Sequence, residues 1–451
     1  MADDKDWVAS VVGGTVTRFD KTTTGRSRGT WLVDVDLPDG TTSALVLRRD
    51  TGDGPLSGTE LSLERESHVY AALTPTAVPI PRLFGQSGDG DALLVERISG
   101  TVELNGLDDA GRAAVADSFI ESVVELHAVD VEALDLPGFH RPVDAADHAL
   151  GDLALWRRIL EAHVRQPDPV LTYAVAWLGA NPPEGPERTV LCHGDLGPGN
   201  FLHEEGRVTG LLDWEFAHLG DPMDDLAWLS IRVAQVGGLG DLDFLLDRYH
   251  EKSGMDIDAD RARYYQLLVL VRMAIACSVA LARRGSGSMD ASTYFALLPL
   301  LRKQMTTLLA AHTGIDLQPP APPVAGHRSS RADIIETLSN DLGTVLAPEL
   351  QTEAARSRVM GMALLLSHLS AADELSRGID DADLDGLEQL LGSRPDSVRA
   401  GDAALNAAIA AGRFCPAELI PLVAHRADRQ IQMWPILAAF AATPLPEVTA
   451  R

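Results

Sequence analysis

Cysteine, positive charge and long apolar runs are all scarce in this sequence. Three cysteines, Cys192, Cys277 and Cys415, lie far apart in 451 residues, which excludes a disulfide framework and a cysteine-rich metal site. Such sparse cysteine suits a reducing compartment, so we expect a cytoplasmic protein. The 38 Lys and Arg residues face 65 Asp and Glu residues, giving a formal net charge of −27. That balance argues against nucleic-acid binding, which requires clustered cations.

We find no uninterrupted apolar span long enough to cross a membrane, and the first residues, Met1 to Asp6, are acidic rather than signal-like. We therefore expect no membrane partner, and the sequence leaves a homo-oligomer open. An apolar content of 45% and a charged content of 23% are typical of a soluble globular protein. The length indicates two or three domains. The acidity would suit a cationic substrate such as an amino sugar, although an ordinary acidic enzyme is the simpler explanation.

The stretch from Leu191 to Asn200 carries the chemistry. Asp195 and Asn200 stand five positions apart, as do the catalytic Asp and the metal-binding Asn of the kinase loop H-R-D-x-x-x-x-N. Between them, Gly197-Pro198-Gly199 favours an irregular loop over a helix. Asp195 is placed to accept a proton from a substrate hydroxyl. Asn200 and Asp213 would supply hard oxygen ligands for Mg²⁺ on the phosphates.

A hairpin is predicted directly after this loop. Phe201 to His203 and Val208 to Leu212 have strand character, and Glu204-Glu205-Gly206 is the turn between them. The hairpin would return Asp213 to the side of Asn200. The alternative is an Asp and an Asn that only cap a turn, which is the usual role of an isolated Asp-x-x-x-x-Asn.

Three motifs in this region resemble those of a known family. They are His193-Gly194-Asp195 with Asn200, Asp213-Trp214-Glu215, and Gly220-Asp221-Pro222. Together they resemble the aminoglycoside phosphotransferase and choline kinase superfamily, and the run DWEFAHLGDPMDDLAW is similar to its acyl-CoA-dehydrogenase-associated branch. The resemblance implies an α+β, protein-kinase-like bilobal fold that uses ATP and Mg²⁺.

Residues 1–100 are predicted to form a β-rich, nucleotide-binding lobe. Strands are expected from Val11 to Phe19 and from Thr30 to Leu37, joined by a turn that contains Gly25 and is rich in hydroxyl and basic groups. Such a turn could fold its amides over phosphates, although most such turns are plain hairpin loops. The resemblance would place a paired glycine nearer the start of this turn, where the sequence has none.

A basic residue and an acidic residue of this lobe are expected to pair. The strand from Thr42 to Arg48 is followed by a helix predicted from Gly58 to Leu73, in which Glu66 lies on the apolar face. The resemblance places the phosphate-anchoring residue at Arg48, where many relatives have Lys, and pairs it with Glu66. The alternatives are a solvated strand-end arginine and a surface carboxylate.

The end of this lobe is predicted to form the hinge between lobes. A buried strand from Ala92 to Glu96 precedes a hinge at Arg97 to Gly100. The resemblance implies that hinge backbone groups bind the adenine, and we include Glu96 among the nucleotide-binding residues. Residues 101–317 then form a helical C-lobe that contains the catalytic loop.

A late helix of the C-lobe carries basic residues. It is predicted from Tyr264 to Ala282, holds Arg272, and is followed by Arg283-Arg284. The resemblance places the substrate site between the catalytic loop and the late helices, so these three arginines could bind an anionic substrate tail. It is equally consistent with the sequence that these arginines only interact favourably with the dipole at the end of the helix.

A proline-rich linker is predicted at residues 318–328, and an all-α domain at 329–451 with separate helices around Val359 to Leu369 and Leu375 to Leu391. This domain resembles a small helical companion of the branch, including that of a 4-hydroxyacyl-CoA kinase. We predict an ATP- and Mg²⁺-dependent kinase for a small-molecule hydroxyl, with a hydroxyacyl-CoA or related catabolic alcohol favoured. The alternatives are an aminoglycoside or other antibiotic phosphotransferase, and a non-catalytic nucleotide-binding module.

Overall fold

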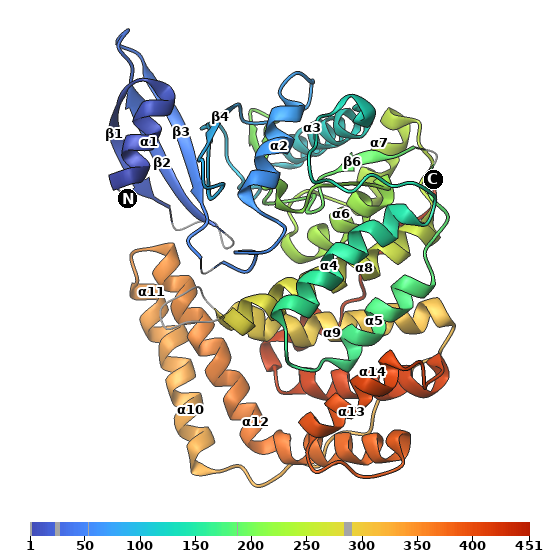
Figure 1. Ribbon diagram of the computed structural model, residues 1–451. Helices are drawn as coiled ribbons and strands as arrows, with labels where there is room; N and C mark the ends of the chain where they lie inside the picture. The colour runs from blue at the N-terminus through green and yellow to red at the C-terminus, as the bar shows by residue number, and fades with distance from the viewer. Residues whose placement is uncertain (1, 23–27, 53, 187, 284–290) are drawn as a thin grey trace. The chain divides into compact units, whose positions relative to one another are not determined.

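The computed structural model describes residues 2–22, 28–52, 54–186, 188–283 and 291–451 (Figure 1). The chain forms two compact units. Unit 1 comprises Met1–Leu155, Pro182–Val269 and Leu445–Arg451, and unit 2 comprises Trp156–Asn181 and Leu270–Pro444. The division into lobes, linker and helical domain predicted above groups the chain differently and stays a prediction.

Unit 1 begins with a helix and a five-stranded antiparallel sheet in the order β1-β2-β3-β5-β4. Their bounds are α1 (Ala2–Val12), β1 (Thr15–Lys21), β2 (Gly29–Asp36), β3 (Thr42–Arg49), β4 (Leu83–Gln86) and β5 (Ala92–Glu96). One face of the sheet packs its apolar residues against Val8 of α1. The strand predicted from Val11 is therefore wrong in its first part, because Val11 and Val12 end a helix.

Helix α2 (Leu63–Leu73) is shorter than predicted. It begins at Leu63 rather than near Gly58 because Ser62 is its N-cap, with a side chain that accepts a hydrogen bond from the amide of Arg65 at 3.2 Å. Turns occupy the preceding segment. The predicted inward face is confirmed, since Glu66 and Tyr70 are both buried.

The rest of unit 1 is mainly helical and carries two small sheets, which pair β6 with β9 and β7 with β8. The β7–β8 pair is the predicted hairpin. The elements are α3 (Asp109–Ala128), η1 (Val131–Ala133), β6 (Val190–Cys192), β7 (Phe201–Glu204), β8 (Arg207–Leu211), η2 (Trp214–Phe216), β9 (His218–Gly220), α6 (Pro222–Val236) and α7 (Leu242–Ser253). A β-rich start followed by helices confirms the α+β class.

Helix α8 (Ala259–Arg283) corrects one expectation. By length and composition alone, an 18-residue window of this helix is apolar enough to cross a membrane. However, 67% of that window is buried inside the protein, as in the core helix of a globular protein. Helices α4 (Asp147–His163) and α8 each contribute residues to both units.

Among its described residues, unit 2 consists of helices and the loops that connect them. Its elements are α5 (Pro169–Ala180), α9 (Ala291–Thr313), α10 (Ser330–Asn340), η3 (Asp341–Leu346), α11 (Ala347–Glu349), α12 (Glu353–Leu391), α13 (Val398–Ala410), α14 (Pro416–Gln432), η4 (Pro435–Leu437) and α15 (Ala438–Ala442). The long helices α10 and α12 pack side by side (Figure 1). The two helices predicted between Val359 and Leu391 are wrong, because one continuous helix covers both.

Candidate active site

The catalytic hairpin brings its predicted ligands together. The amide of Leu212 donates to the carbonyl of Asn200 at 2.8 Å, directly beyond the β7–β8 pairing. Asp213, the residue after Leu212, therefore lies beside Asn200, as predicted. Asp213 also adopts φ 61° and ψ 58°, a left-handed conformation that is uncommon outside glycine and clusters at functional sites.

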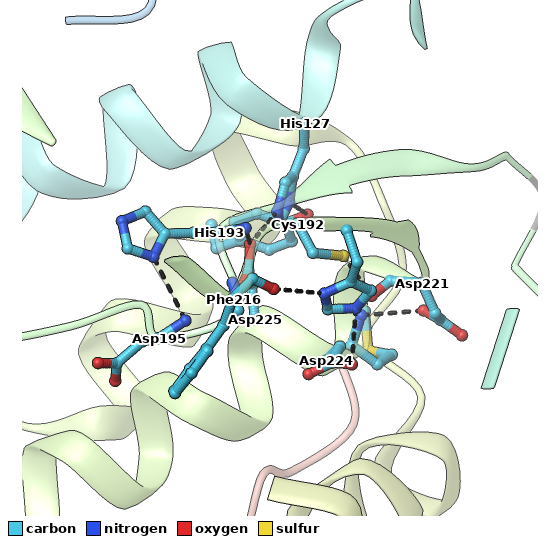
Figure 2. A network of polar contacts seen from close by, with 12 residues as sticks. His127, Cys192, His193, Asp195, Phe216, Asp221, Asp224 and Asp225 are labelled. Atoms are coloured by element: carbon cyan, nitrogen blue, oxygen red, sulfur yellow. Dashed lines mark hydrogen bonds and ion pairs between the residues drawn. The ribbon is translucent and has the colours of Figure 1, made fainter. Parts of the chain in front are cut away.

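A buried carboxylate beneath the loop holds its backbone (Figure 2). Asp225 of α6 accepts hydrogen bonds from the amides of His193 and Gly194, each at 2.8 Å, and His127 donates to it at 3.0 Å. Burial alone would raise the pKa of Asp225, but the hydrogen bonds from His127 and the loop outweigh burial and lower it. An ionised Asp225 thus fixes the position at which the catalytic loop begins.

His193 organises the loop rather than moving protons. Its Nε2 donates to the carbonyl of Leu212 at 2.8 Å, and its Nδ1 accepts the amide of Asp195 at 3.3 Å. Burial lowers the pKa of His193, despite the opposing charge of Asp225. A neutral ring with one donor and one acceptor already engaged joins the loop to the hairpin end.

Asp195 is set up as a base of moderate strength. Burial raises the pKa of its carboxyl to about 6, while the Arg232 guanidinium and Asn200 oppose that rise. Its Oδ1 is buried and has no hydrogen-bond partner among the described residues. The side chain of Asn200 donates from Nδ2 to the backbone carbonyl of Asp195 at 2.7 Å. That bond ties the two predicted site residues together.

Arg48 lies among three carboxylates. It contacts Glu66, the α2 residue with which it was predicted to pair. Its Nη2 also lies 3.0 Å from Asp213 and 3.8 Å from Glu215. Burial would lower the pKa of Arg48, but these acidic neighbours raise it well above its ordinary value. Burial raises the pKa of Glu66, which Arg48 opposes and the other two carboxylates reinforce.

This donor set fits a magnesium ion. Counted over these ion pairs alone and with all three carboxylates ionised, one arginine and three acidic groups carry a formal excess of two negative charges. Asp213 is 47% exposed, so its carboxylate is accessible. Mg²⁺ typically takes one or two carboxylates together with waters and substrate phosphates. Among the described residues, no group of three or more His, Cys, Asp or Glu side chains is arranged to hold a metal ion by itself.

The remaining nucleotide-binding predictions are less well defined. Gly25 lies outside the described residues. Glu96 ends β5 with an exposed side chain, and its carboxylate accepts the amide of Arg82 at 3.4 Å. Its role stays a prediction.

The three predicted substrate arginines differ in their surroundings. Arg272 is buried, with 1% exposure, and its role in substrate binding stays a prediction. Arg283 ends α8, and its Nη2 lies 3.0 Å from Nδ1 of His163 within unit 2. Arg284 lies outside the described residues.

Two residues of the site were not assigned from the sequence. Glu215 belongs to the quoted DWE motif, but its contact with Arg48 depends on the turn η2. Arg232 lies on α6, with Nε 3.5 Å from Oδ1 of Asp195. The signal for Arg232 was its spacing of seven from Asp225, which puts both on one face of the helix.

A further contact joins α2 to the segment that follows the β7–β8 hairpin. Arg65, next to Glu66, donates to the carbonyl of Ala217 at 2.8 Å and lies 3.6 Å from the ring centre of Phe139. Burial lowers the pKa of Arg65 to about 10. Neighbouring residues of one helix thus bind Arg48 on one side and the chain after Asp213 on the other.

The family follows from this constellation and from the sequence comparison. The model of the APH family, described as the phosphotransferase enzyme family, matches residues 25–266, which is more than half of the chain. The match covers Arg48, Glu66, the β7–β8 hairpin and α6, whereas Arg272 and Arg283 lie beyond it. The chain belongs to the phosphotransferase enzyme family, whose members act on hydroxyl groups of small molecules.

Relatives of two kinds are similar to this chain. Acyl-CoA dehydrogenase family member 11 of Rattus norvegicus is 24% identical over 257 residues, which is 51% of this chain and 32% of that protein. An aminoglycoside 3'-phosphotransferase of Streptomyces fradiae is 28% identical over 207 residues, which is 42% of this chain and 72% of that protein. The chain spans about a third of the length of the dehydrogenase relative.

Solved structures of similar fold are also known. A putative aminoglycoside phosphotransferase from Ralstonia eutropha has a TM-score of 0.49 at 21% identity, with 68% of this chain and 95% of that chain covered. The macrolide 2'-phosphotransferase of Brachybacterium faecium has a TM-score of 0.45 at 23% identity, with 66% and 98% covered.

Proposed function

We propose that this protein transfers the γ-phosphoryl group of ATP to a hydroxyl group of a small molecule. The observation that carries the proposal is the meeting of Asp195, Asn200 and Asp213 at one end of a hairpin, next to the Arg48–Glu66 pair. Phosphoryl transfer needs positioning and charge stabilisation more than covalent chemistry. The set provides a base, two oxygen ligands and an anchored cation.

Each residue then has a defined task. Asp195 orients the acceptor hydroxyl and takes up its proton. Arg48, held by Glu66, binds the α- and β-phosphates. Asn200 and Asp213 would hold Mg²⁺, which neutralises charge on the phosphate oxygens when bound.

For the acceptor we propose a hydroxyacyl-CoA or a related catabolic alcohol. Support comes from the relatives named acyl-CoA dehydrogenase family members, in which a region similar to this chain forms part of a longer protein. The charge of −27 would repel a polyanionic CoA at long range, so such a substrate needs a local cation. An aminoglycoside is the second candidate, favoured by the Streptomyces fradiae relative, 72% of which is covered.

One screen tests the activity, and one pair of variants tests the acceptor class. Turnover of Mg·ATP against hydroxyacyl-CoAs and aminoglycosides should identify at least one acceptor. Binding of Mg·ATP with no turnover on any alcohol would instead support a nucleotide-binding module. Reversing Arg283 and Arg284 to Glu should raise the KM of a CoA acceptor and lower that of a polycation. The matched control reverses Arg356 and Arg358, both exposed, which changes the net charge equally.

A further inference from the structure

Arg232 is placed at the catalytic base by the same helix face that holds the loop. Asp225 and Arg232 lie seven residues apart on α6, or nearly two helical turns. Asp225 binds the start of the loop at His193 and Gly194. Arg232 reaches its middle, where its Nε lies 3.5 Å from Oδ1 of Asp195.

The loop is shaped to admit this side chain. Gly197 and Gly199 have φ of +142° and +96°, a region that favours glycine. A Cβ on Gly197 would lie 2.7 Å from Cβ of Arg232, and one on Gly199 would lie 3.3 Å from its Nη2. The absence of a side chain at these two glycines therefore leaves room for Arg232 against the loop.

Arg232 keeps hydrogen-bonding capacity that its surroundings do not use. Its Nε and Oδ1 of Asp195 are both buried without a hydrogen-bond partner among the described residues, and 3.5 Å is too long for a good N–H···O bond. A guanidinium has several donors in a planar fork suited to oxyanions. Arg48, by contrast, already contacts three carboxylates. The side chain of Arg232 is 21% exposed, so part of it reaches solvent.

We propose that Arg232 is an oxyanion-binding residue of the transfer site. The inference rests on the proposed function, in which a bond forms between the acceptor oxygen and the γ-phosphorus and the bond to the β-phosphate oxygen breaks. Its electron pair leaves with ADP, and the hydroxyl proton passes to Asp195. The oxyanion bound by Arg232 comes either from the phosphoryl group in transfer or from an anionic group that the acceptor carries near its hydroxyl. Either source disfavours ammonium groups at this position.

The first arm tests the phosphoryl source through binding. MgADP with aluminium fluoride mimics the phosphoryl group in transfer. If that group is the source, Arg232→Ala should weaken formation of the fluoride complex by ~10-fold or more, the usual worth of a charge-assisted hydrogen bond. MgADP alone should bind unchanged, and Arg232→Lys should restore part of the loss. Arg207→Ala, which removes an exposed arginine of the same unit, is the matched control.

The second arm tests the acceptor source. In this arm 3-hydroxybutyrate and 3-hydroxybutyramide present the same alcohol with and without a negative charge. If the acceptor supplies the oxyanion, Arg232→Ala should weaken binding of the carboxylate by ~10-fold and leave binding of the amide and of the fluoride complex unchanged. If neither complex responds in a variant that keeps the wild-type melting temperature, Arg232 has only a packing role and the inference fails.

A third measurement separates this inference from the proposed function. Inorganic phosphate, titrated without nucleotide, should bind the wild-type protein more tightly than Arg232→Ala by ~10-fold. Wild-type protein that binds phosphate through Arg232 but shows no MgADP binding would contradict the kinase function and retain the oxyanion site. The opposite outcome is normal MgADP binding, with phosphate, the fluoride complex and the acceptor bound equally well by the wild-type protein and Arg232→Ala. That outcome would contradict the oxyanion site and leave the kinase function intact.

Discussion

Each unit of this chain contains a buried cluster of arginines and carboxylates, and only one of the two is balanced in charge. In unit 1, Arg48 lies within 4 Å of Glu66, Asp213 and Glu215. In unit 2, Asp383 forms ion pairs with Arg429 at 2.6 Å and with Arg426 at 3.1 Å. Arg426 also forms an ion pair with Asp402 at 2.7 Å. Counted over these ion pairs alone, the first cluster has one cation for three acidic groups, whereas the second has two cations for two acidic groups.

The difference separates a binding site from a scaffold. A buried charge without a partner costs several kcal/mol, so a structural cluster is expected to be balanced, as in unit 2. The two surplus carboxylate charges of unit 1 are tolerated because Asp213 is 47% exposed and Glu215 is 13% exposed. A surplus of two negative charges, partly open to solvent, matches a divalent cation.

Removing the most exposed member of the unbalanced cluster should have the largest effect. Asp213→Ala should lower turnover by ~10³-fold or more, because metal stabilisation of the transition state is worth several kcal/mol. Titration of Mg²⁺ at fixed ATP, followed by kinetics and calorimetry, provides the measurement. Asp109→Ala, at an exposed aspartate of the same unit, is the control. An unchanged magnesium requirement in the Asp213 variant would exclude it as a ligand.

Breaking the balanced cluster should affect folding and leave binding intact. Asp383→Leu leaves Arg426 and Arg429 with Asp402 as their remaining carboxylate, so the free energy of unfolding should fall by ~3 kcal/mol. Denaturant unfolding gives that value, and Asp381→Leu, at an exposed position of the same helix, is the control. If Asp383→Leu lost affinity for Mg·ATP while keeping wild-type stability, the assignment of the unit 2 cluster to folding alone would be wrong.

Asp195 should behave as a site residue that carries no part of the fold. Asp195→Asn preserves shape but removes the proton acceptor, so turnover should fall by ~10²-fold or more. Nucleotide affinity should be nearly unchanged, because we assign nucleotide binding to Arg48 and Glu66 and not to Asp195. Single-turnover kinetics and calorimetry on the same preparation separate the two quantities. Loss of ATP binding together with a high rate would instead make Asp195 a structural residue.

The hairpin and the faces on which Arg48 and Glu66 lie are predictable because short-range rules determine them. Alternation along β3 sends Leu45 and Leu47 into the core beneath α1 and Arg48 to the other face. Helical spacing does the same for Glu66 on α2. The contact between them was implied by the family resemblance, because spacing alone left a solvated arginine and a surface carboxylate as alternatives.

Other features depend on close approach between distant segments, which spacing does not reveal. Gly378 resembles a helix breaker in the sequence, yet it lies inside α12, where a Cβ would come 2.1 Å from the carbonyl oxygen of Val324. At the N-terminus, the valines before Gly13 favour a strand by propensity, but Val8 packs as part of a helix on the sheet. Arg232 was missed although its spacing from Asp225 places both residues on one face of α6, because that spacing does not show that the catalytic loop contacts this face.

The pH dependence of the rate should reflect the burial of the base. Burial raises the pKa of Asp195 to about 6, and only the ionised carboxylate can accept the hydroxyl proton. The rate should therefore be constant above this pH and fall ~10-fold per pH unit below it. In Asp195→Asn this acid limb should vanish from the residual rate. A limb that persists in that variant would assign the titration to another group.

The smallest expected effect tests whether the charge surplus itself matters. Glu215→Gln keeps the size of the side chain and reduces the surplus of the Arg48 cluster from two negative charges to one. Glu215 lies at the edge of the cluster, 3.8 Å from Arg48, so the loss should be about 1 kcal/mol after screening. Mg²⁺ affinity in the presence of ATP should thus fall ~5-fold, with turnover at saturating Mg²⁺ close to that of the wild type. If Glu215→Gln binds Mg²⁺ as tightly as the wild type, the surplus is incidental, and the metal affinity of the site arises from Asn200 and Asp213 as ligands.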